Sequence, residues 1–199
     1  AFPWAKALLA LPDGNLLVLI GESLVLRSEG EWSVVISDTD MSVFSVFSPR
    51  LKQSDDGTIW LLVPGKIWRV SADLADVSIV LEAPEASLLE SFCLDPSGDL
   101  WVIQGGRQGA TKLIHIPLVD SLPAERGTWQ EFPGPFHDEG NEAHITASQD
   151  GLIWYASKYR HTGIEVFDPQ KGTWRTRENQ DVTHACYSIQ KSHDGSIWA

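Results

Sequence analysis

The sequence predicts an all-β protein, a β-propeller fragment of about four and a half four-stranded antiparallel blades. Three observations support this prediction. A glycine-centred phrase recurs along the chain, the phrase contains a tight-hairpin signal, and the copies lie one blade length apart. Units of roughly 40–50 residues with four short strands are typical of propeller blades. The whole chain, residues 1–199, is therefore assigned to one partial propeller.

The recurring phrase is a glycine, then any residue, then Ile or Leu, then Trp. Complete copies follow four glycines, and a weaker copy with Leu in place of Trp follows a fifth. The five anchor glycines are Gly14, Gly57, Gly98, Gly151 and Gly195. An apolar residue stands six positions before each glycine, and Asp directly precedes all of them except Gly98, which follows Ser97. A shared turn, apolar position and aromatic position indicate a true repeat.

The phrase predicts the first two strands of each blade. Asp-Gly between apolar segments is a strong hairpin signal, because glycine adopts a positive φ freely and Asp tolerates it. Later turns supply the third and fourth strands, for example at Pro64-Gly65 and at Asp168–Gly172. A polar insertion at 119–127 separates the last two strands of the third blade.

The predicted blades follow one another without a linker. They span residues 5–40, 41–86, 87–140, 141–182 and 183–199, the last one truncated. Because a propeller closes only when its last blade packs on its first, four blades and two strands make an incomplete ring. We therefore expect the chain to be a piece of a longer protein.

Most of the nine tryptophans follow the repeat. One set comes three residues after the anchor glycine and includes Trp60, Trp101, Trp154 and Trp198. We expect these rings to fill the space between blades, because large aromatic side chains dominate core burial. The alternative is an exposed aromatic platform that stacks against sugars.

Composition excludes several classes of partner. The net charge is −12 and no basic stripe occurs, which disfavours nucleic acid and anionic membranes. No apolar run approaches the roughly 20 residues of a membrane-spanning helix. Cys93 and Cys186 fall in first strands two blades apart and are expected to be buried without a disulfide.

The sequence contains no recognised catalytic motif, phosphate-binding glycine loop or paired zinc motif. The densest polar stretch, 136–144, could supply metal ligands by residue type, but its spacing matches no known metal loop, and a connection between blades is polar anyway. We therefore predict no catalytic residue, no metal and no cofactor, and expect that this segment is not an enzyme.

Propeller geometry still suggests where a ligand would bind. The residue seven positions before each anchor glycine opens the innermost strand at one mouth of the channel, on the face that also carries the loops between second and third strands. Arg, Tyr and His side chains there could bind an acidic ligand or a sugar. The alternative is a hydrated rim. The candidate residues are Arg50, Arg107, His144, Tyr159, Arg160, His161 and His184.

The phrase I-x-x-S-x-D-G-x-I-W at 145–154 and 189–198 resembles the two-component regulator propeller repeat. That family implies a seven-bladed, extracytoplasmic, ligand-sensing propeller of a bacterial signal-transduction protein, with an oligosaccharide or small molecule as ligand. It also implies that the remaining blades, and a histidine kinase module, lie elsewhere in the parent chain. The first blade departs by lacking Trp, and the third by its Pro96-Ser97 turn and its insertion.

The Asp-Gly-x-Ile-Trp phrase is also similar to that of the virginiamycin B (streptogramin) lyase propellers. This second resemblance implies a magnesium-dependent enzyme, for which His144, His184 and Glu142 would be the candidate residues. Leu61-Leu62 and the matching pairs depart from the Phe and Thr-Glu that usually follow the Trp in that family. A protein-interaction scaffold is the third alternative.

Overall fold

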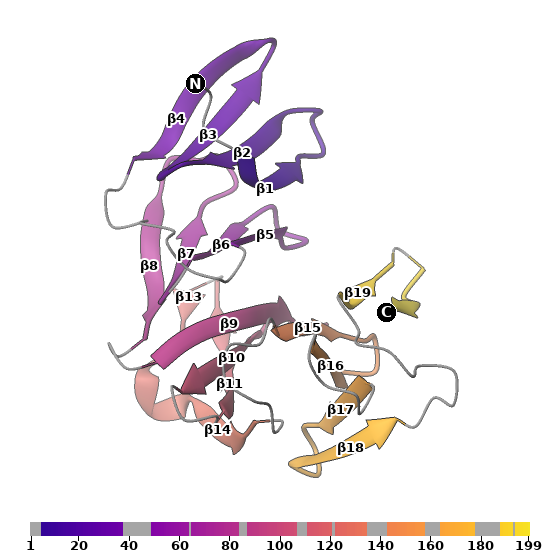
Figure 1. Ribbon diagram of the computed structural model, residues 1–199. Helices are drawn as coiled ribbons and strands as arrows, with labels where there is room; N and C mark the ends of the chain where they lie inside the picture. The colour runs from indigo at the N-terminus through magenta and orange to yellow at the C-terminus, as the bar shows by residue number, and fades with distance from the viewer. Residues whose placement is uncertain are drawn as a thin grey trace. The chain divides into compact units, whose positions relative to one another are not determined.

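The computed structural model consists almost entirely of antiparallel β-sheet (Figure 1). It describes residues 5–37, 49–63, 65–83, 87–106, 111–120, 122–134, 143–157, 164–177, 188–192 and 194–199. The chain forms two compact units, Ala1–Glu82 and Ala83–Ala199. Each unit is considered by itself below.

The first unit contains two four-stranded sheets whose strands follow one another in chain order. The first sheet consists of β1 (Ala5–Ala10), β2 (Leu16–Ile20), β3 (Ser23–Ser28) and β4 (Glu31–Ser37). The second sheet consists of β5 (Arg50–Gln53), β6 (Ile59–Val63), β7 (Lys66–Val70) and β8 (Val77–Glu82). All neighbouring strands pair antiparallel.

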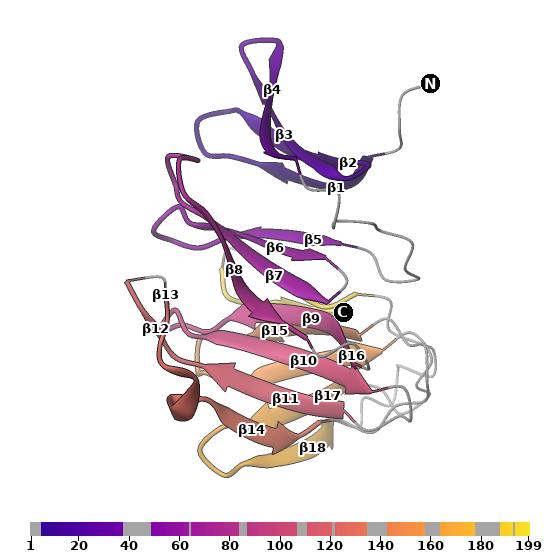
Figure 2. The same cartoon turned by 90° about the vertical axis from the view of Figure 1, so that its left-hand side faces the viewer.

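The second unit contains two further four-stranded sheets and a two-stranded one. The third sheet consists of β9 (Ser87–Leu94), β10 (Leu100–Gly106), β11 (Thr111–Ile116) and β14 (Gln130–Pro133). The fourth consists of β15 (Ala143–Ala147), β16 (Ile153–Ser157), β17 (Ile164–Asp168) and β18 (Thr173–Arg177). The fifth pairs β19 (Gln190–Lys191) with β20 (Ile197–Trp198). Figure 2 shows the strands of the third and fourth sheets from the side.

The insertion predicted in the third blade forms a small hairpin of its own. Its strands are β12 (Leu118–Val119) and β13 (Leu122–Pro123), and a short 3-10 helix, Arg126–Thr128, follows before β14. It is the only helical segment in the ranges given above. Within those ranges, no helix is long and apolar enough to cross a membrane.

First strands of successive sheets lie next to one another within each unit. In the first unit β1 neighbours β5, and in the second unit β15 lies between β9 and β19. The backbone N–H of Ile145 on β15 donates a 3.0 Å hydrogen bond to the Ser91 hydroxyl on β9. Within each unit, successive sheets thus meet at their first strands, as propeller blades do.

The glycine phrase forms the predicted hairpin turn between the first and second strands. All five anchor glycines have φ between +79° and +90°. In the second sheet, the carboxylate of Asp56 accepts hydrogen bonds from the Ser54 hydroxyl at 2.5 Å and from the Thr58 backbone N–H at 3.0 Å. A negative side chain before a left-handed glycine therefore closes the turn on itself.

The third sheet makes the same turn with the two polar residues exchanged. Asp95 occupies the position of Ser54, and Ser97 occupies that of Asp56. The Ser97 hydroxyl donates a 2.5 Å hydrogen bond to Asp95. A serine therefore still donates to an aspartate, but here the serine follows the aspartate in the sequence. The atypical Pro96-Ser97 turn is thus an equivalent solution and leaves the hairpin intact.

The sheets within each unit pack through one repeated contact. In one sheet, the contacting side chains are the third and fifth after the anchor glycine. In the next sheet, they are the second and fourth after its own anchor glycine. In the first unit, Leu17 and Leu19 share a core with Ile59 and Leu61. In the second unit the members of the same contact are Trp101 and Ile103 with Ile153 and Tyr155, and then Trp154 and Ala156 with Ile197.

The repeated tryptophans have different degrees of burial. Trp60 is 0 % exposed and Trp101 is 2 % exposed, as expected for rings that fill the space between blades. Trp154 is half-buried, and Trp198 is 69 % exposed. Cys93 is buried in the core between the third and fourth sheets, as predicted. Cys186 lies outside the described residues.

Acid sensitivity is expected at the turn of the fifth sheet. Hydrogen bonds from the hydroxyls of Ser192 and Ser196, and from the Ser196 backbone N–H, lower the pKa of Asp194 to about 2. Because the folded-state pKa lies below the ordinary aspartate pKa of 3.8, the stabilisation is complete above that pH and disappears as the pH falls towards 2. Carboxyl NMR titration of Asp194 should show this low pKa, and the double change of Ser192→Ala with Ser196→Ala should raise it. A midpoint near 4 in the unchanged protein would contradict the turn geometry.

Candidate functional site

Two of the predicted ligand-binding residues lie in the described ranges. Arg50 is the first residue of β5 in the first unit, and His144 is the second residue of β15 in the second unit; both are half-buried. The other five lie outside the described residues, as does Glu142: Arg107, Tyr159, Arg160, His161 and His184. The structure therefore does not test whether the predicted set forms one site.

The second unit brings three inner-strand residues of equivalent repeat position onto neighbouring segments. Ser91 lies on β9, His144 on β15, and Ser188 two residues before β19. Ser91 is fully buried, whereas His144 and Ser188 are half-buried. Since Ala143 and Ile145 belong to the core facing the third sheet, His144 lies on the opposite face of its strand. The hydrogen bond from the Ile145 backbone N–H to the Ser91 hydroxyl fixes how β9 and β15 are aligned beside His144.

Glu90, which sequence reasoning missed, adds a buried carboxylate beside Ser91. It is 6 % exposed and is the extra residue of a β-bulge, since Ser91 pairs with Ile103 and Leu89 pairs with Gln104. Its side chain lies over Gly105 on β10, where a Cβ atom would come within 1.8 Å of Glu90 Oε1. Only glycine leaves this space. The glycine pair 105–106 is the signal in the sequence that could have indicated this space.

These residues could support chemistry beside the inner strands. A buried carboxylate can act as a general base or bind a divalent cation, and imidazole is a second ligand of suitable type. Bulges often re-aim side chains beside active sites.

A second buried carboxylate, Glu165, is 8 % exposed and lies on β17 opposite Tyr155 in the fourth sheet.

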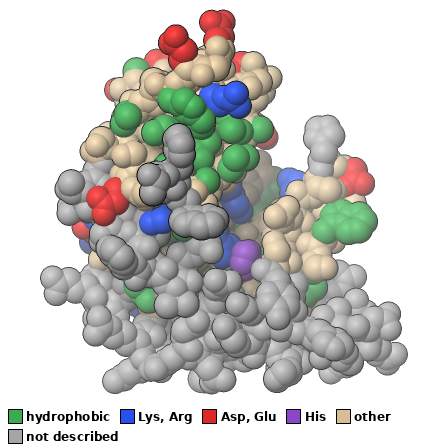
Figure 3. Space-filling model, turned by 45° about the horizontal axis from the view of Figure 1, so that its top comes forward, with side chains coloured by type: hydrophobic (Ala, Val, Ile, Leu, Met, Phe, Trp, Pro, Cys, Tyr) green, Lys and Arg blue, Asp and Glu red, His purple; other side chains and the backbone are tan. Residues whose placement is uncertain are grey.

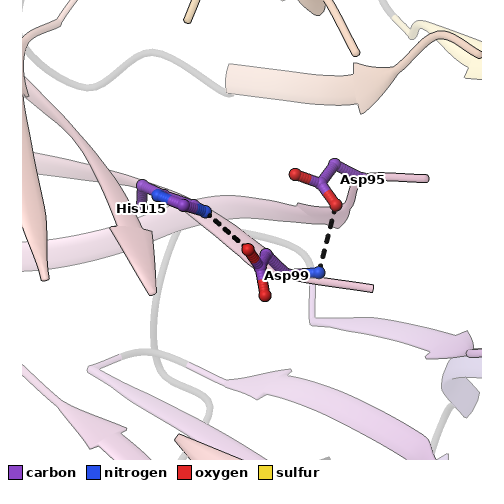
Figure 4. Close-up of side chains that lie close together, drawn as sticks. All are labelled: Asp95, Asp99 and His115. Atoms are coloured by element: carbon purple, nitrogen blue, oxygen red, sulfur yellow. Dashed lines mark hydrogen bonds and ion pairs between the residues drawn. The ribbon is translucent and has the colours of Figure 1, made fainter. Parts of the chain in front are cut away.

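A separate cluster of Asp95, Asp99 and His115 lies at the other end of the third sheet (Figure 4). Ligand atoms of the three residues lie within 4.8 Å of one another. His115 Nε2 is 3.0 Å from Asp99 Oδ2, and the imidazole ring stacks on Trp101 with a centroid distance of 4.4 Å. By residue type, the cluster could bind a metal ion.

The hydrogen bonds of this cluster indicate a structural role instead. Asp95 accepts from the Asp99 backbone N–H at 3.1 Å and from Trp101 Nε1 at 2.9 Å. The other oxygen of Asp99 accepts from the Leu118 backbone N–H at 2.9 Å. All four carboxylate oxygens are thus occupied, and the cluster ties the first turn of the sheet to β11 and to the β12–β13 insertion. The sequence alone does not indicate this role of His115.

Comparison with known proteins identifies the fold. No protein-family model matches the chain, and no curated protein matches it in sequence. Among solved structures, a gluconolactonase from Xanthomonas campestris aligns with a TM-score of 0.62 and 14 % identity over 92 % of this chain and 64 % of its own. A luciferin-regenerating enzyme aligns with a TM-score of 0.64 and 10 % identity over 96 % of this chain and 67 % of its own.

A third similar structure belongs to a signalling protein. The extracellular domain of a protein described as a hybrid two-component system, from B. thetaiotaomicron, aligns with a TM-score of 0.59 and 10 % identity. That alignment covers 96 % of this chain but 25 % of the other. This chain thus spans between a quarter and two thirds of the structures that it resembles.

These structures correct the prediction that the chain is not an enzyme. Two of the three neighbours are named as enzymes, so the propeller repeat is no reason to exclude catalysis. The expected resemblance to two-component regulators is supported at the level of the propeller, and one such protein is among the neighbours. At these identities the likeness shows the fold alone. The chain is an all-β protein with the β-propeller fold.

Proposed function

We propose that this chain is part of a propeller enzyme that opens a cyclic ester, with a divalent cation bound at the site. The observation that supports this most directly is the buried Glu90 carboxylate at a bulge of an inner strand, with Gly105 making room for it. The neighbouring inner strand carries a half-buried imidazole, His144, next to the residue that bonds to Ser91. The substrate class is suggested by the gluconolactonase with the same fold.

Glu90 would act as the general base. Its carboxylate takes a proton from water, the water oxygen attacks the carbonyl carbon of the lactone, and the ring C–O bond breaks. The departing alkoxide oxygen takes up the proton, so that one lactone and one water give one hydroxy acid. A divalent cation at the site would supply Lewis-acid polarisation of the carbonyl, with the imidazole of His144 as a ligand of suitable type.

The test measures cation binding and lactone opening with the purified protein. Calorimetric titration with Ca²⁺, Mg²⁺ and Mn²⁺ is compared with pH-stat assays on glucono-δ-lactone. Glu90→Gln should lower the rate by roughly 10²–10⁴-fold, the usual contribution of a general base. Glu131→Gln, at a carboxylate with a side chain 57 % exposed on β14, is the matched control and should leave the rate unchanged. Equal rates in the two variants, or no lactone opening by the unchanged protein, would rule out the proposed role.

A second proposal is ligand sensing in a bacterial two-component protein outside the cytoplasm. It is supported by the alignment of 96 % of this chain with the extracellular domain from B. thetaiotaomicron. In this case an oligosaccharide or small molecule would bind at the inner strands of the second unit, with His144 among its contacts. The complete reading frame should then encode a membrane span and a kinase or regulator module. A frame without either would contradict this proposal while leaving the lactone assay unaffected.

A further inference from the structure

The second unit buries two carboxylates, Glu90 and Glu165. Figure 3 shows acidic side chains exposed on one side of the molecule. In contrast, Glu90 is 6 % exposed and Glu165 is 8 % exposed, and no other charged side chain is buried among the described residues. Burying a carboxylate costs free energy unless a cation or hydrogen-bond donors meet it. Two such side chains in one unit therefore indicate a place where charge is needed.

The strand pairings place the Glu165 side chain between the third and fourth sheets. Glu165 lies directly opposite Tyr155 on β16 and two residues before Phe167 on β17, so the three side chains share one face of the fourth sheet. Tyr155 and Phe167 belong to the core cluster that also contains Ile103 of the third sheet. The Glu165 carboxylate therefore points toward the third sheet.

The Glu90 side chain enters the same space from the third sheet. Ile103 and Gly105 are alternate residues of β10, so they face the same side of the sheet. Ile103 belongs to the core cluster between the third and fourth sheets. A Cβ atom on Gly105 would lie 1.8 Å from Glu90 Oε1, which places the carboxylate on this side of β10. Glu90 and Glu165 thus project into one space from two sheets.

The two sheets are aligned so that these residues lie at the same end. The backbone N–H of Ile145 donates its hydrogen bond to the Ser91 hydroxyl, next to the bulge residue on β9. Ser91 lies opposite Ile103 in the third sheet. In the fourth sheet, Ile145 lies opposite Tyr155, and Tyr155 lies opposite Glu165. The row of side chains that contains Glu165 therefore lies beside the row that begins at Ser91.

The next row of the third sheet contains small residues on β10, on β11 and directly after β14. These are Gly105, Thr111 and Gly134: Thr111 lies opposite Gly105, and the Gly134 backbone N–H donates a 2.8 Å hydrogen bond to the Thr111 carbonyl. A Cβ atom on Gly134 would lie 2.3 Å from the Thr111 hydroxyl oxygen. These three positions place nothing larger than a threonine side chain beside the two carboxylates, which favours a polar ligand there.

The repeat shows that the charge of Glu165 is an exception. Glu165 pairs with the residue four positions after the anchor glycine, and the residues at the same place in the other four-stranded sheets are Val25, Trp68 and Ile114. An apolar side chain is thus compatible with this position, and the fold alone does not require a carboxylate. Residues that break a local rule at some cost in stability are expected at functional sites.

We propose that Glu165 determines substrate specificity by accepting hydrogen bonds from hydroxyl groups of the lactone. This inference rests on the proposed function, in which Glu90 acts as general base at the ester carbonyl group. A carboxylate has two acceptor oxygens, so neighbouring hydroxyls of a sugar lactone match it. A lactone without hydroxyls would leave the buried carboxylate without these bonds, and polar sites reject such analogues for this reason. The substrate class is therefore a polyhydroxylated lactone.

The test compares glucono-δ-lactone with δ-valerolactone, which has the same ring size and no hydroxyl group. Glu165→Gln should raise KM for glucono-δ-lactone and lower kcat/KM by about 10–100-fold, the usual contribution of hydrogen bonds to a charged group. The value of kcat/KM for δ-valerolactone should not fall. Glu131→Gln, at a side chain 57 % exposed on β14, is the matched control and should leave both values unchanged.

A second variant separates recognition from stability. Glu165→Ile installs the residue type of Ile114, which occupies the same place in the third sheet. Because an apolar residue in place of a buried charge is often neutral or stabilising, this variant should keep the melting temperature of the unchanged protein. It should lose the preference for glucono-δ-lactone over δ-valerolactone as Glu165→Gln does.

The proposal and the function on which it rests fail in different ways. If Glu90→Gln slows both lactones, while Glu165→Gln slows both equally or neither, Glu165 does not recognise hydroxyls and the general base is unaffected. If the melting temperature falls in both Glu165 variants and the preference between the lactones stays, Glu165 has a structural role instead. If the unchanged protein opens neither lactone, the proposed function is wrong, and the role of Glu165 is wrong with it.

Discussion

Replacing Trp101 with alanine is expected to lower the free energy of unfolding by about 3–5 kcal/mol, the usual cost of removing a buried large aromatic side chain. Trp101 is 2 % exposed and stacks on His115 and Phe132 with centroid distances of 4.4 and 6.0 Å. Phe167 of the fourth sheet lies 5.9 Å from the same ring. The alanine variant would leave a cavity between two sheets and would also free Asp95 of its indole partner. Urea denaturation followed by fluorescence and circular dichroism measures the difference.

Two companion variants separate packing from hydrogen bonding. Trp101→Phe keeps an aromatic ring but loses the 2.9 Å bond from Nε1 to Asp95, and should cost about 1–3 kcal/mol. Trp198→Ala changes a residue of the same repeat position that is 69 % exposed, and should cost less than about 0.5 kcal/mol. Trp154 is half-buried and should fall between the two. If Trp101→Ala cost no more than Trp198→Ala, the contact between the sheets would be wrongly placed.

Replacing Gly105 with alanine should be nearly as damaging, although it adds only one methyl group. The new Cβ would lie 1.8 Å from Glu90 Oε1 and 2.7 Å from its carboxyl carbon, so the buried side chain must move. Overpacking of this kind costs about 1–3 kcal/mol. The displaced carboxylate would also leave its position at the proposed site, and lactone opening or cation binding should fall together with stability.

A double-mutant cycle identifies the cause of this loss. Glu90→Ala removes the side chain that the new methyl group meets, so Gly105→Ala should cost less in that background, and the coupling energy should exceed about 0.5 kcal/mol. Gly127→Ala is the matched control, because no atom lies within 4 Å of its added Cβ, and it should be neutral. Additive effects of the two changes would mean that Glu90 does not occupy the space over Gly105.

The sequence predicts the repeating parts of this fold well, for a physical reason. The turn at each anchor glycine depends on neighbours within four residues, such as Ser54, Asp56 and Thr58, and local interactions of this kind are visible in a single sequence. The alternating apolar residues then specify which side of each strand is buried. The all-β class and the four-stranded sheets follow from these two features alone.

The candidate site was less predictable, because it depends on pairing between distant residues. The bulge that places Glu90 arises from the register of β9 against β10, and its space depends on Gly105, fifteen positions later in the chain. His115 likewise acquires its role through Asp99 and the insertion at Leu118. Neither relation leaves a periodic signal. The predicted His144 lies on an inner strand as expected, but its ligand role stays a prediction.

The exchanged turn of the third sheet bears on how such repeats diverge. In the second and fourth sheets, Trp60 and Trp154 donate their indole N–H to the serines at 54 and 148, whereas Trp101 donates to Asp95. One hydroxyl and one carboxylate serve all three turns, and only their order along the chain differs. A sequence profile that scores each position of the repeat independently counts two mismatches in this turn, although no hydrogen bond has been lost. Recognising distant copies of this repeat therefore requires that the two turn positions be scored together as a pair.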